Sequence, residues 1–207
     1  MAENSTKHRF ERGIERRDPA TIEPQPVVGS GTVSHWDFET VTEFARGNDD
    51  ILVLPRREAT KGYDIVEAGR VHEYWAIVRR EDAARELRFG MNELRLRSAE
   101  LAEDILGLVA SFLDQFDIEQ AKIRLEITRT QSCPKFHCDN EHVRLVTTYI
   151  GPTTEYQYAG KDEICTAPLH GLVFLKGRRH PTHGNTVFHR SPEVPAGEKR
   201  LCLAIDY

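Results

Sequence analysis

The sequence predicts an α+β protein in which helices come first and an antiparallel β core occupies the C-terminal half. Two observations support this prediction. In residues 37–45 and 98–116 the apolar residues recur every three or four positions, which is the period of a helix, whereas from Lys122 onward they alternate with polar residues, as in half-buried strands. Gly and Pro turns also divide the alternating part into short segments. Short strands at this spacing are typical of an antiparallel sandwich or barrel.

The clearest helix is predicted over residues 98–116. Its apolar residues form one stripe, Ser98 is a good N-terminal cap, and acidic residues in the first turn suit the helix dipole. A second helix is predicted over residues 37–45, where apolar side chains again recur at helical spacing. The apolar run Ile51–Leu54 predicts a short buried strand, and the charged residues 81–97 are compatible with a helix.

Five short strands are predicted in the C-terminal half, each an apolar or alternating segment between turns: residues 123–127, 145–150, 172–175, 187–189 and 201–205. Residues 1–30 mix charges with prolines and show little apolar periodicity, so we expect a flexible arm there. Residues 31–207 are expected to form a single domain, since a chain of this length can bury a full core.

Composition argues against several classes of protein. The net charge of −5 argues against nucleic acid as a partner, and no apolar run is long enough to cross a membrane. The N-terminus lacks an apolar signal segment and the four cysteines are too few for a disulfide framework, so we expect a cytoplasmic protein with reduced thiols. Residues 121–207 carry 12 basic and 9 acidic side chains, which makes this half the better place for an anion.

The densest group of metal-ligand residue types lies around His137 and Asp139. These residues are two positions apart, so in an extended segment both side chains project to the same face. A His and an Asp on one face provide two ligands of a 2-His-1-carboxylate triad, which leaves coordination positions open on Fe(II). The third ligand has to come from a distant strand, and His189 lies on a predicted strand fifty residues after Asp139.

Arg200 opens the last predicted strand, eleven residues after His189. Alternation places it on one face with Cys202 and Ala204, opposite an apolar face. A guanidinium above small side chains can receive a carboxylate through two parallel hydrogen bonds. The sequence therefore predicts a metal-ligand set and an anion-binding arginine in the same half of the chain.

The order of these motifs resembles that of the Fe(II)/2-oxoglutarate-dependent dioxygenases, nearest the prolyl-hydroxylase-like branch. The shared features are His-x-Asp, a strand, about fifty residues, and then His-x-Ser-Pro with an arginine opening the next strand, over roughly residues 121–207. Longer motifs, including Cys-Pro-Lys-Phe-His-Cys-Asp-Asn and Phe-Leu-Lys-Gly, resemble a bacterial family known as domain of unknown function 1826. That second resemblance spans more of the chain but implies no activity.

The dioxygenase resemblance implies an α+β fold with a double-stranded β-helix (a cupin-like jelly roll) in the C-terminal half. We expect residues 121–207 to form it, with the helices of residues 37–116 packed outside. The implied activity is that of an Fe(II)/2-oxoglutarate-dependent dioxygenase that oxidises, most simply hydroxylates, an unidentified small-molecule or peptide substrate.

The resemblance also assigns roles to individual residues. It makes three side chains the iron ligands: His137, Asp139 and His189. Arg200 would pair with the distal carboxylate of 2-oxoglutarate. Thr147 and Tyr149 share a face of the strand after the His-x-Asp motif, and their hydroxyls could bind the same carboxylate, although both are also ordinary strand residues.

Two other functions remain open. The same ligands, supplemented by Cys133, Cys138 or His142, could bind Zn²⁺ in a non-oxygenase protein of the same fold, for metal homeostasis, sensing or hydrolysis. Thiolates favour zinc, and thiols are unusual beside an oxygen-activating centre because they are easily oxidised. Arg200, in contrast, has no role at a zinc site. A binding module without catalysis is the third possibility. The sequence contains no P-loop, dinucleotide-binding glycine motif, G-x-S-x-G or H-E-x-x-H, which argues against nucleotide and standard hydrolase functions.

Overall fold

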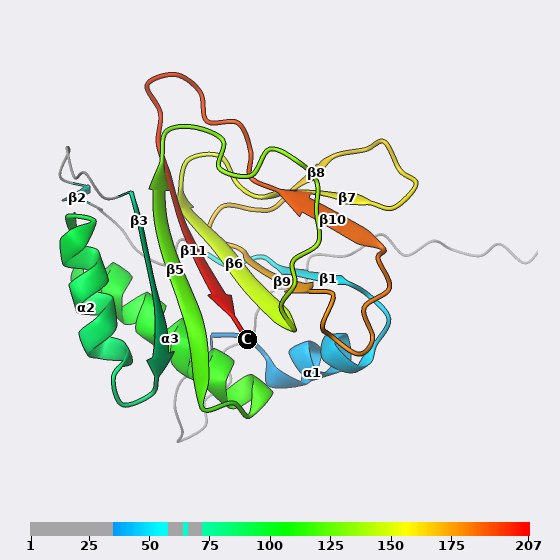
Figure 1. The fold of residues 1–207 in the computed structure, drawn as a ribbon, viewed down its shortest axis with the longest axis horizontal. Helices are drawn as coiled ribbons and strands as arrows, with labels where there is room; N and C mark the ends of the chain where they lie inside the picture. The colour runs from blue at the N-terminus through cyan, green and yellow to red at the C-terminus, as the bar shows by residue number, and fades with distance from the viewer. Residues whose placement is uncertain (1–34, 58–63, 66–71) are drawn as a thin grey trace, which may run out of the picture. The chain divides into compact units, whose positions relative to one another are not determined.

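The computed structural model describes residues 35–57, 64–65 and 72–207, with the backbone alone for residues 64–65. The arm expected over residues 1–30 lies outside the described residues. The described chain contains helices and antiparallel strands, as the sequence predicts, and Figure 1 shows their arrangement.

The described chain forms three helices: α1 (Phe38–Arg46), α2 (Ala83–Glu93) and α3 (Ala99–Phe116). The helix predicted over residues 98–116 is confirmed as α3, and the Ser98 hydroxyl accepts the backbone N–H of Leu101 at its start. The helix predicted over residues 37–45 is confirmed as α1, which Asp37 caps through Thr40. None of the described helices is long and apolar enough to cross a membrane.

The largest sheet has six strands, and every neighbouring pair is antiparallel. Its strand order is β1 (Ile51–Leu54), β9 (Leu172–Lys176), β6 (Val143–Ile150), β11 (Arg200–Asp206), β5 (Gln120–Thr128) and β3 (Glu73–Arg79). A second sheet consists of β10 (Val187–Arg190), β7 (Glu155–Tyr158) and β8 (Cys165–Thr166), and β2 (Asp64–Ile65) pairs with β4 (Leu96–Arg97).

All five strands predicted after residue 121 are present, but the six-stranded sheet also recruits β1 and β3 from the N-terminal half. The strand predicted at Ile51–Leu54 is confirmed as β1, whereas β3 was not expected from the sequence. No alternation marks β3 in the sequence, because Trp75 and Ile77 on its exposed face are as apolar as the residues on its buried face. The exposed fractions of these two side chains are 61% and 58%.

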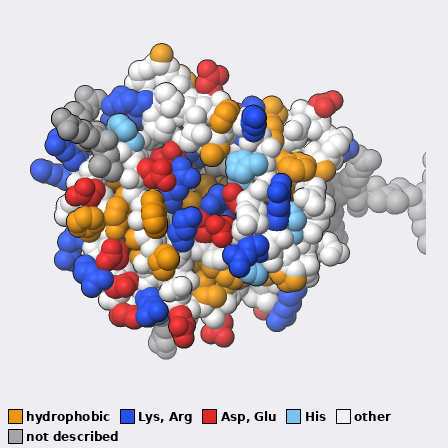
Figure 2. Space-filling model, viewed as in Figure 1, with side chains coloured by type: hydrophobic (Ala, Val, Ile, Leu, Met, Phe, Trp, Pro, Cys, Tyr) orange, Lys and Arg blue, Asp and Glu red, His pale blue; other side chains and the backbone are white. Residues whose placement is uncertain are grey.

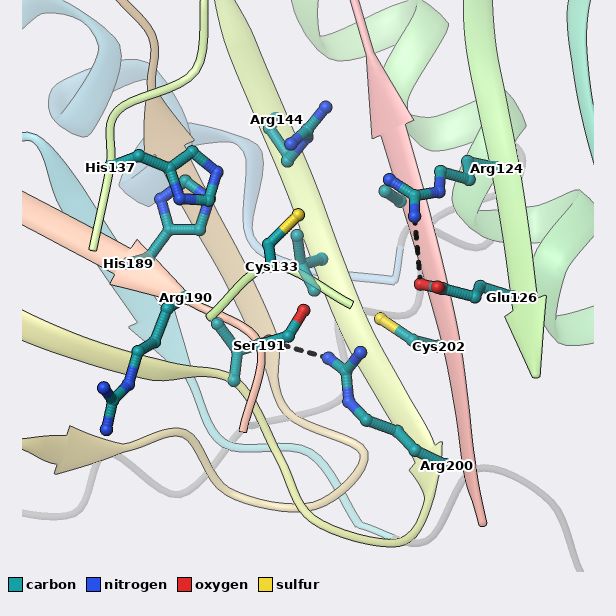
Figure 3. Close-up of a pocket in the computed structure, with 13 residues that line it drawn as sticks. Arg124, Glu126, Cys133, His137, Arg144, His189, Arg190, Ser191, Arg200 and Cys202 are labelled. Atoms are coloured by element: carbon teal, nitrogen blue, oxygen red, sulfur yellow. Dashed lines mark hydrogen bonds and ion pairs between the residues drawn. The ribbon is translucent and has the colours of Figure 1, made fainter. Parts of the chain in front are cut away.

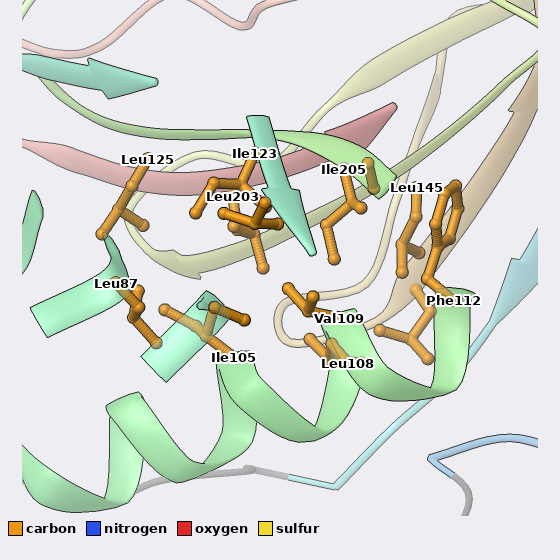
Figure 4. Close-up of a cluster of buried hydrophobic side chains, with 14 of the residues drawn as sticks. Leu87, Ile105, Leu108, Val109, Phe112, Ile123, Leu125, Leu145, Leu203 and Ile205 are labelled. Atoms are coloured by element: carbon orange, nitrogen blue, oxygen red, sulfur yellow. The ribbon is translucent and has the colours of Figure 1, made fainter. Parts of the chain in front are cut away.

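The main apolar core lies between α3 and one face of the six-stranded sheet (Figure 4). Ile105, Val109 and Phe112 of α3 belong to the same buried cluster as Leu125 of β5 and Leu203 of β11. Each fully buried side chain of this size contributes roughly 1.5–3 kcal/mol of hydrophobic stabilisation. Because side chains alternate along a strand, the residues between these apolar positions face the other side of the sheet. That second face carries the polar residues of the candidate site.

Candidate metal centre

His137, Asp139 and His189 come together, and their ligand atoms all lie within 4.8 Å of one another. Two backbone hydrogen bonds cause this juxtaposition: the N–H of His137 donates to the carbonyl of His189, and the N–H of His189 donates to the carbonyl of His137, both at 3.0 Å. The extended His-x-Asp segment is thereby fixed beside β10. The two imidazole centroids are 4.5 Å apart (Figure 3).

The orientation of each side chain suits metal binding. Nδ1 of His137 lies 2.8 Å from the Lys135 carbonyl, so a proton on Nδ1 leaves the lone pair of Nε2 free for a ligand bond. Nε2 of His189 is 3.1 Å from Oδ2 of Asp139, and Nε2 of His137 is 3.6 Å from Oδ1. All three donors therefore converge on one point.

Arg144 holds the Asp139 carboxylate in place. Its Nη1 donates to Oδ1 of Asp139 at 2.6 Å, while Nε and Nη2 donate to the two carboxylate oxygens of Asp206 at 2.6 and 2.8 Å. Burial would raise the pKa of Asp139, but His189 and Arg144 together lower that pKa to about 2. The carboxylate is therefore ionised at neutral pH, as a metal ligand must be.

The three residues fit a metal ion of the 2-His-1-carboxylate type. Oδ2 of Asp139 is buried and accepts no hydrogen bond of good geometry from the described residues. Ligand atoms that share one ion at about 2.1 Å lie within about 4 Å of one another, so these side chains need only small adjustments. A cation at this point would satisfy Oδ2 of Asp139, which lies 3.1 Å from Nε2 of His189.

A cavity of about 60 Å³ opens beside the triad, on the sheet face opposite α3 (Figure 3). His137 and His189 line one side of it, and residues of β5, β6 and β11 form its floor. The other lining residues are Arg124, Glu126, Cys133, Arg144, Val146, Thr154, Arg190, Ser191, Arg200, Cys202 and Ala204. Arg124 is paired with Glu126 at 3.1 Å, and Arg190 is paired with Glu155 at 2.6 Å.

Arg200 faces this cavity together with Cys202 and Ala204, as the alternation of the last strand predicts. Its exposed fraction is 3%. Nε donates to the Pro152 carbonyl at 3.0 Å, and Nη2 lies 3.2 Å from the Thr154 hydroxyl and 3.4 Å from the Thr148 hydroxyl. Within the described residues Arg200 forms no ion pair, so its buried charge contacts neutral oxygens only.

The structure does not bring Thr147 and Tyr149 to the cavity. Both belong to the opposite face of β6, where the Tyr149 hydroxyl donates to Oδ2 of Asp104 at 2.7 Å. Burial and the Asp104 charge raise the pKa of Tyr149 well above its usual range, so the hydroxyl stays a donor. The expectation that they contact the anion is therefore corrected: alternation along β6 turns Arg144 and Val146 to the cavity and Thr148 to Arg200.

The hydroxyls that do contact Arg200 are those of Thr148 and Thr154. Thr148 lies directly between the two residues expected from the sequence. The face of β6 on which Thr148 lies could have been predicted by counting in steps of two from Arg144, a charged residue at the start of the same strand. Thr154 lies in the turn before β7, and no sequence pattern marks it.

Of the other candidate ligands, only Cys133 lines the cavity. The Cys138 thiol donates to the Val187 carbonyl at 3.2 Å, and burial raises the pKa of that thiol. The His142 ring stacks on Tyr207, with centroids 5.5 Å apart. Cys138 and His142 are therefore engaged elsewhere in the fold.

Comparison with protein families gives one match, to the family described as "Protein of unknown function (DUF1826)", over residues 64–206. The chain belongs to this family. The match includes all three triad residues and Arg200. No curated protein matches the sequence.

Solved structures similar to this family member include dioxygenases, at low identity. The dioxygenase for auxin oxidation 1 from Arabidopsis thaliana, in a complex with 2-oxoglutarate, has a TM-score of 0.41 and 13% identity, with 72% of this chain and 69% of that chain covered. A Pseudomonas putida prolyl-4-hydroxylase gives a TM-score of 0.35 and 14% identity, with 69% and 95% covered. A viral collagen prolyl hydroxylase from Paramecium bursaria Chlorella virus 1 gives 0.31 and 9%, with 64% and 94% covered.

Proposed function

We propose that this protein is an Fe(II)/2-oxoglutarate-dependent oxygenase that hydroxylates a small-molecule or peptide substrate. The observation that supports this most is Arg200, a buried guanidinium without an acidic partner in the described chain, which faces the same cavity as the triad. A metal site alone explains His137, Asp139 and His189. It does not explain a buried, uncompensated positive charge beside them.

The proposal extends to the fold. The six-stranded sheet and the sheet β10–β7–β8 would be the two sheets of a double-stranded β-helix, with the helices outside. Supporting this, the cavity is lined both by the six-stranded sheet and by His189 and Arg190 of β10, while α3 packs on the opposite face of the larger sheet. In such an arrangement the metal lies between the sheets, away from the helices.

His137, Asp139 and His189 would hold the iron, and Arg144 keeps the carboxylate ionised and oriented. Bound Fe(II) supplies the chemistry that oxidises 2-oxoglutarate to succinate and carbon dioxide with O₂ and transfers an oxygen atom to the substrate. The protein contributes ligand geometry and a shielded pocket.

Arg200 would bind the carboxylate of 2-oxoglutarate that is remote from the metal. An ion buried without a counter-ion costs several kcal/mol, and the mutual attraction with a bound carboxylate offsets that cost. Pro152 and Thr154 fix the guanidinium before the ligand arrives, which reduces the entropy lost on binding. The pocket is thus preformed for a dianion that reaches from a metal to an arginine.

One observation favours the zinc-binding alternative: the Cys133 thiol lines the cavity beside the triad. Thiolate is a preferred ligand of zinc, and a fourth ligand would complete a tetrahedral site. This alternative leaves the buried charge of Arg200 without a purpose, which is why we prefer the oxygenase.

An anaerobic titration tests the proposal. We expect the purified protein with Fe(II) and 2-oxoglutarate to develop the visible charge-transfer absorbance of a metal-chelated 2-oxo acid. His189→Ala should abolish stoichiometric metal binding, while His142→Ala, which changes a histidine outside the cavity, should bind metal as the wild type does. Zinc retained through purification, with no such absorbance after iron loading, would overturn the oxygenase in favour of the zinc protein.

A further inference from the structure

The strand β3 is an unusual edge of the six-stranded sheet. It pairs with β5 along one side, and no other described strand pairs with its second side. Trp75 and Ile77 project from the same face of β3, and more than half of each side chain is exposed. Edge strands are normally protected by charges or prolines at their centre, because an apolar edge can pair with another chain. Here the centre of the edge is apolar. Figure 1 shows β3 at the left side of the large sheet, and hydrophobic side chains reach the surface on the left side of the same view in Figure 2.

The backbone groups of β3 that face outward can be identified. The His72 carbonyl accepts the N–H of Ile127, so the residue pair 72 and 127 is a hydrogen-bonded pair of the β3–β5 ladder. In an antiparallel ladder such pairs alternate with pairs whose N–H and C=O groups point away. The outward groups of β3 are therefore those of odd-numbered residues. Asp82 occupies the backbone N–H and C=O of Arg79, which leaves Trp75 and Ile77 at the centre of the edge.

The sequence of β3, Glu-Tyr-Trp-Ala-Ile-Val-Arg, is complementary to itself when it is reversed. In an antiparallel pair centred on Ala76, Trp75 lies opposite Ile77 of the second strand, and the outward backbone groups of both residues have no partner among the described residues. The same register sets Glu73 opposite the second Arg79. Each of these cross-strand pairs is of a favourable kind, apolar with apolar and negative with positive.

The two charged residues are available for such pairs. The Glu73 side chain is 45% exposed, although one of its oxygens lies 2.8 Å from Arg124. Arg79 is exposed and has no ion pair with the described residues. A two-fold axis through Ala76 makes both charge pairs at once, as an isologous dimer requires.

We propose that β3 is the docking edge for a second copy of this chain, so that two six-stranded sheets join into one continuous sheet through antiparallel β3–β3 pairing. We choose a second copy as the partner because, in an antiparallel pair of two β3 strands, each Glu73 lies opposite the Arg79 of the other strand. Trp75 and Ile77 do not line the metal cavity, so the proposal is independent of the oxygenase function.

Sedimentation velocity of the full chain over a concentration series tests the pairing. We expect a dimer at about 10 µM protein, and Ile77→Lys should raise the dimer dissociation constant at least tenfold. Ile164→Lys is the matched control, because Ile164 is also an exposed isoleucine, at 46%, but belongs to another part of the chain. A wild type that stays monomeric at about 100 µM, or a dimer that Ile77→Lys leaves intact, overturns the proposal.

A mixing experiment tests the register. Glu73→Arg alone places arginine opposite arginine, and Arg79→Glu alone places glutamate opposite glutamate, so each variant should be mainly monomeric. Mixed in equal amounts, the two variants restore both charge pairs in a one-to-one dimer. If the mixture associates no better than its components, the proposed register is wrong.

Discussion

Arg144 and Arg200 lie on neighbouring strands and face the same cavity, yet the protein treats their charges in opposite ways. Arg144 contacts the carboxylates of Asp139 and Asp206. Arg200 is more deeply buried, but among the described residues its guanidinium contacts only a carbonyl and two hydroxyls. The fold alone satisfies the first charge, whereas no acidic group among the described residues neutralises the second. Burial of an arginine is therefore not in itself a sign of a binding site, whereas a missing counter-charge is.

The largest effect is expected where removal of one arginine leaves two acids uncompensated. Arg144→Ala should lower the free energy of unfolding by about 3–5 kcal/mol, because Asp139 and Asp206 would remain buried without their partner. Urea denaturation followed by circular dichroism measures this. Arg124→Ala is the control, since Arg124 is more exposed and its pairs should contribute only about 1 kcal/mol or less. Equal losses in the two variants would contradict the structural role given to Arg144.

Arg200→Ala should act on ligand binding rather than on folding. We expect the dissociation constant for 2-oxoglutarate to rise at least tenfold, since a lost charge-assisted pair is worth more than about 1.4 kcal/mol. Metal affinity should scarcely change, because Arg200 contacts none of the three ligands. Calorimetric titration of the metal-loaded protein without oxygen checks both values.

Arg200→Lys sharpens this prediction. This variant keeps the charge but removes the planar guanidinium, so its affinity for 2-oxoglutarate should lie between those of the wild type and Arg200→Ala. Unchanged 2-oxoglutarate binding in both variants would mean that Arg200 serves the fold, as Arg144 does.

Much of the candidate site could be predicted from the sequence, because it depends on local periodicity. Side chains two residues apart on an extended segment project to the same face, and this rule predicted that His137 and Asp139 lie together. The same rule placed Arg200 with Cys202 and Ala204. His189 was identified as the distant partner only through the order of motifs, since no local pattern shows which strand lies opposite the His-x-Asp segment.

The errors have an equally local cause. Which face of β6 meets the cavity is set by α3, whose Asp104 binds Tyr149 from the other side. After Arg144 the sequence of β6 is apolar or neutral on both faces. The strand β3 escaped prediction because both of its faces are apolar. Alternation assigns a face only where the two faces differ in polarity.

Tyr149→Phe tests the corrected face of β6. Removing the hydroxyl takes one donor from the buried Asp104, which keeps its contact with Arg56 at 2.6 Å. We expect a loss of about 1.5 kcal/mol in the free energy of unfolding, since a hydrogen bond to a charged group is broken. The dissociation constant for 2-oxoglutarate should stay the same. If 2-oxoglutarate binding were weakened and the free energy of unfolding unchanged, Tyr149 would have to face the cavity.

The smallest effect, and one of opposite sign, is expected for Thr147→Val. The Thr147 hydroxyl is buried on the α3 side of β6 and has no hydrogen-bond partner among the described residues. Valine has the same shape without the hydroxyl, so the variant avoids the cost of an unsatisfied buried polar group. We expect a gain of up to about 1 kcal/mol in the free energy of unfolding and no change in 2-oxoglutarate affinity.

Thr148→Val, one residue further along, should instead weaken 2-oxoglutarate binding, because that hydroxyl lies against the Arg200 guanidinium. If the two variants exchanged these effects, the register of β6 described above would be off by one residue.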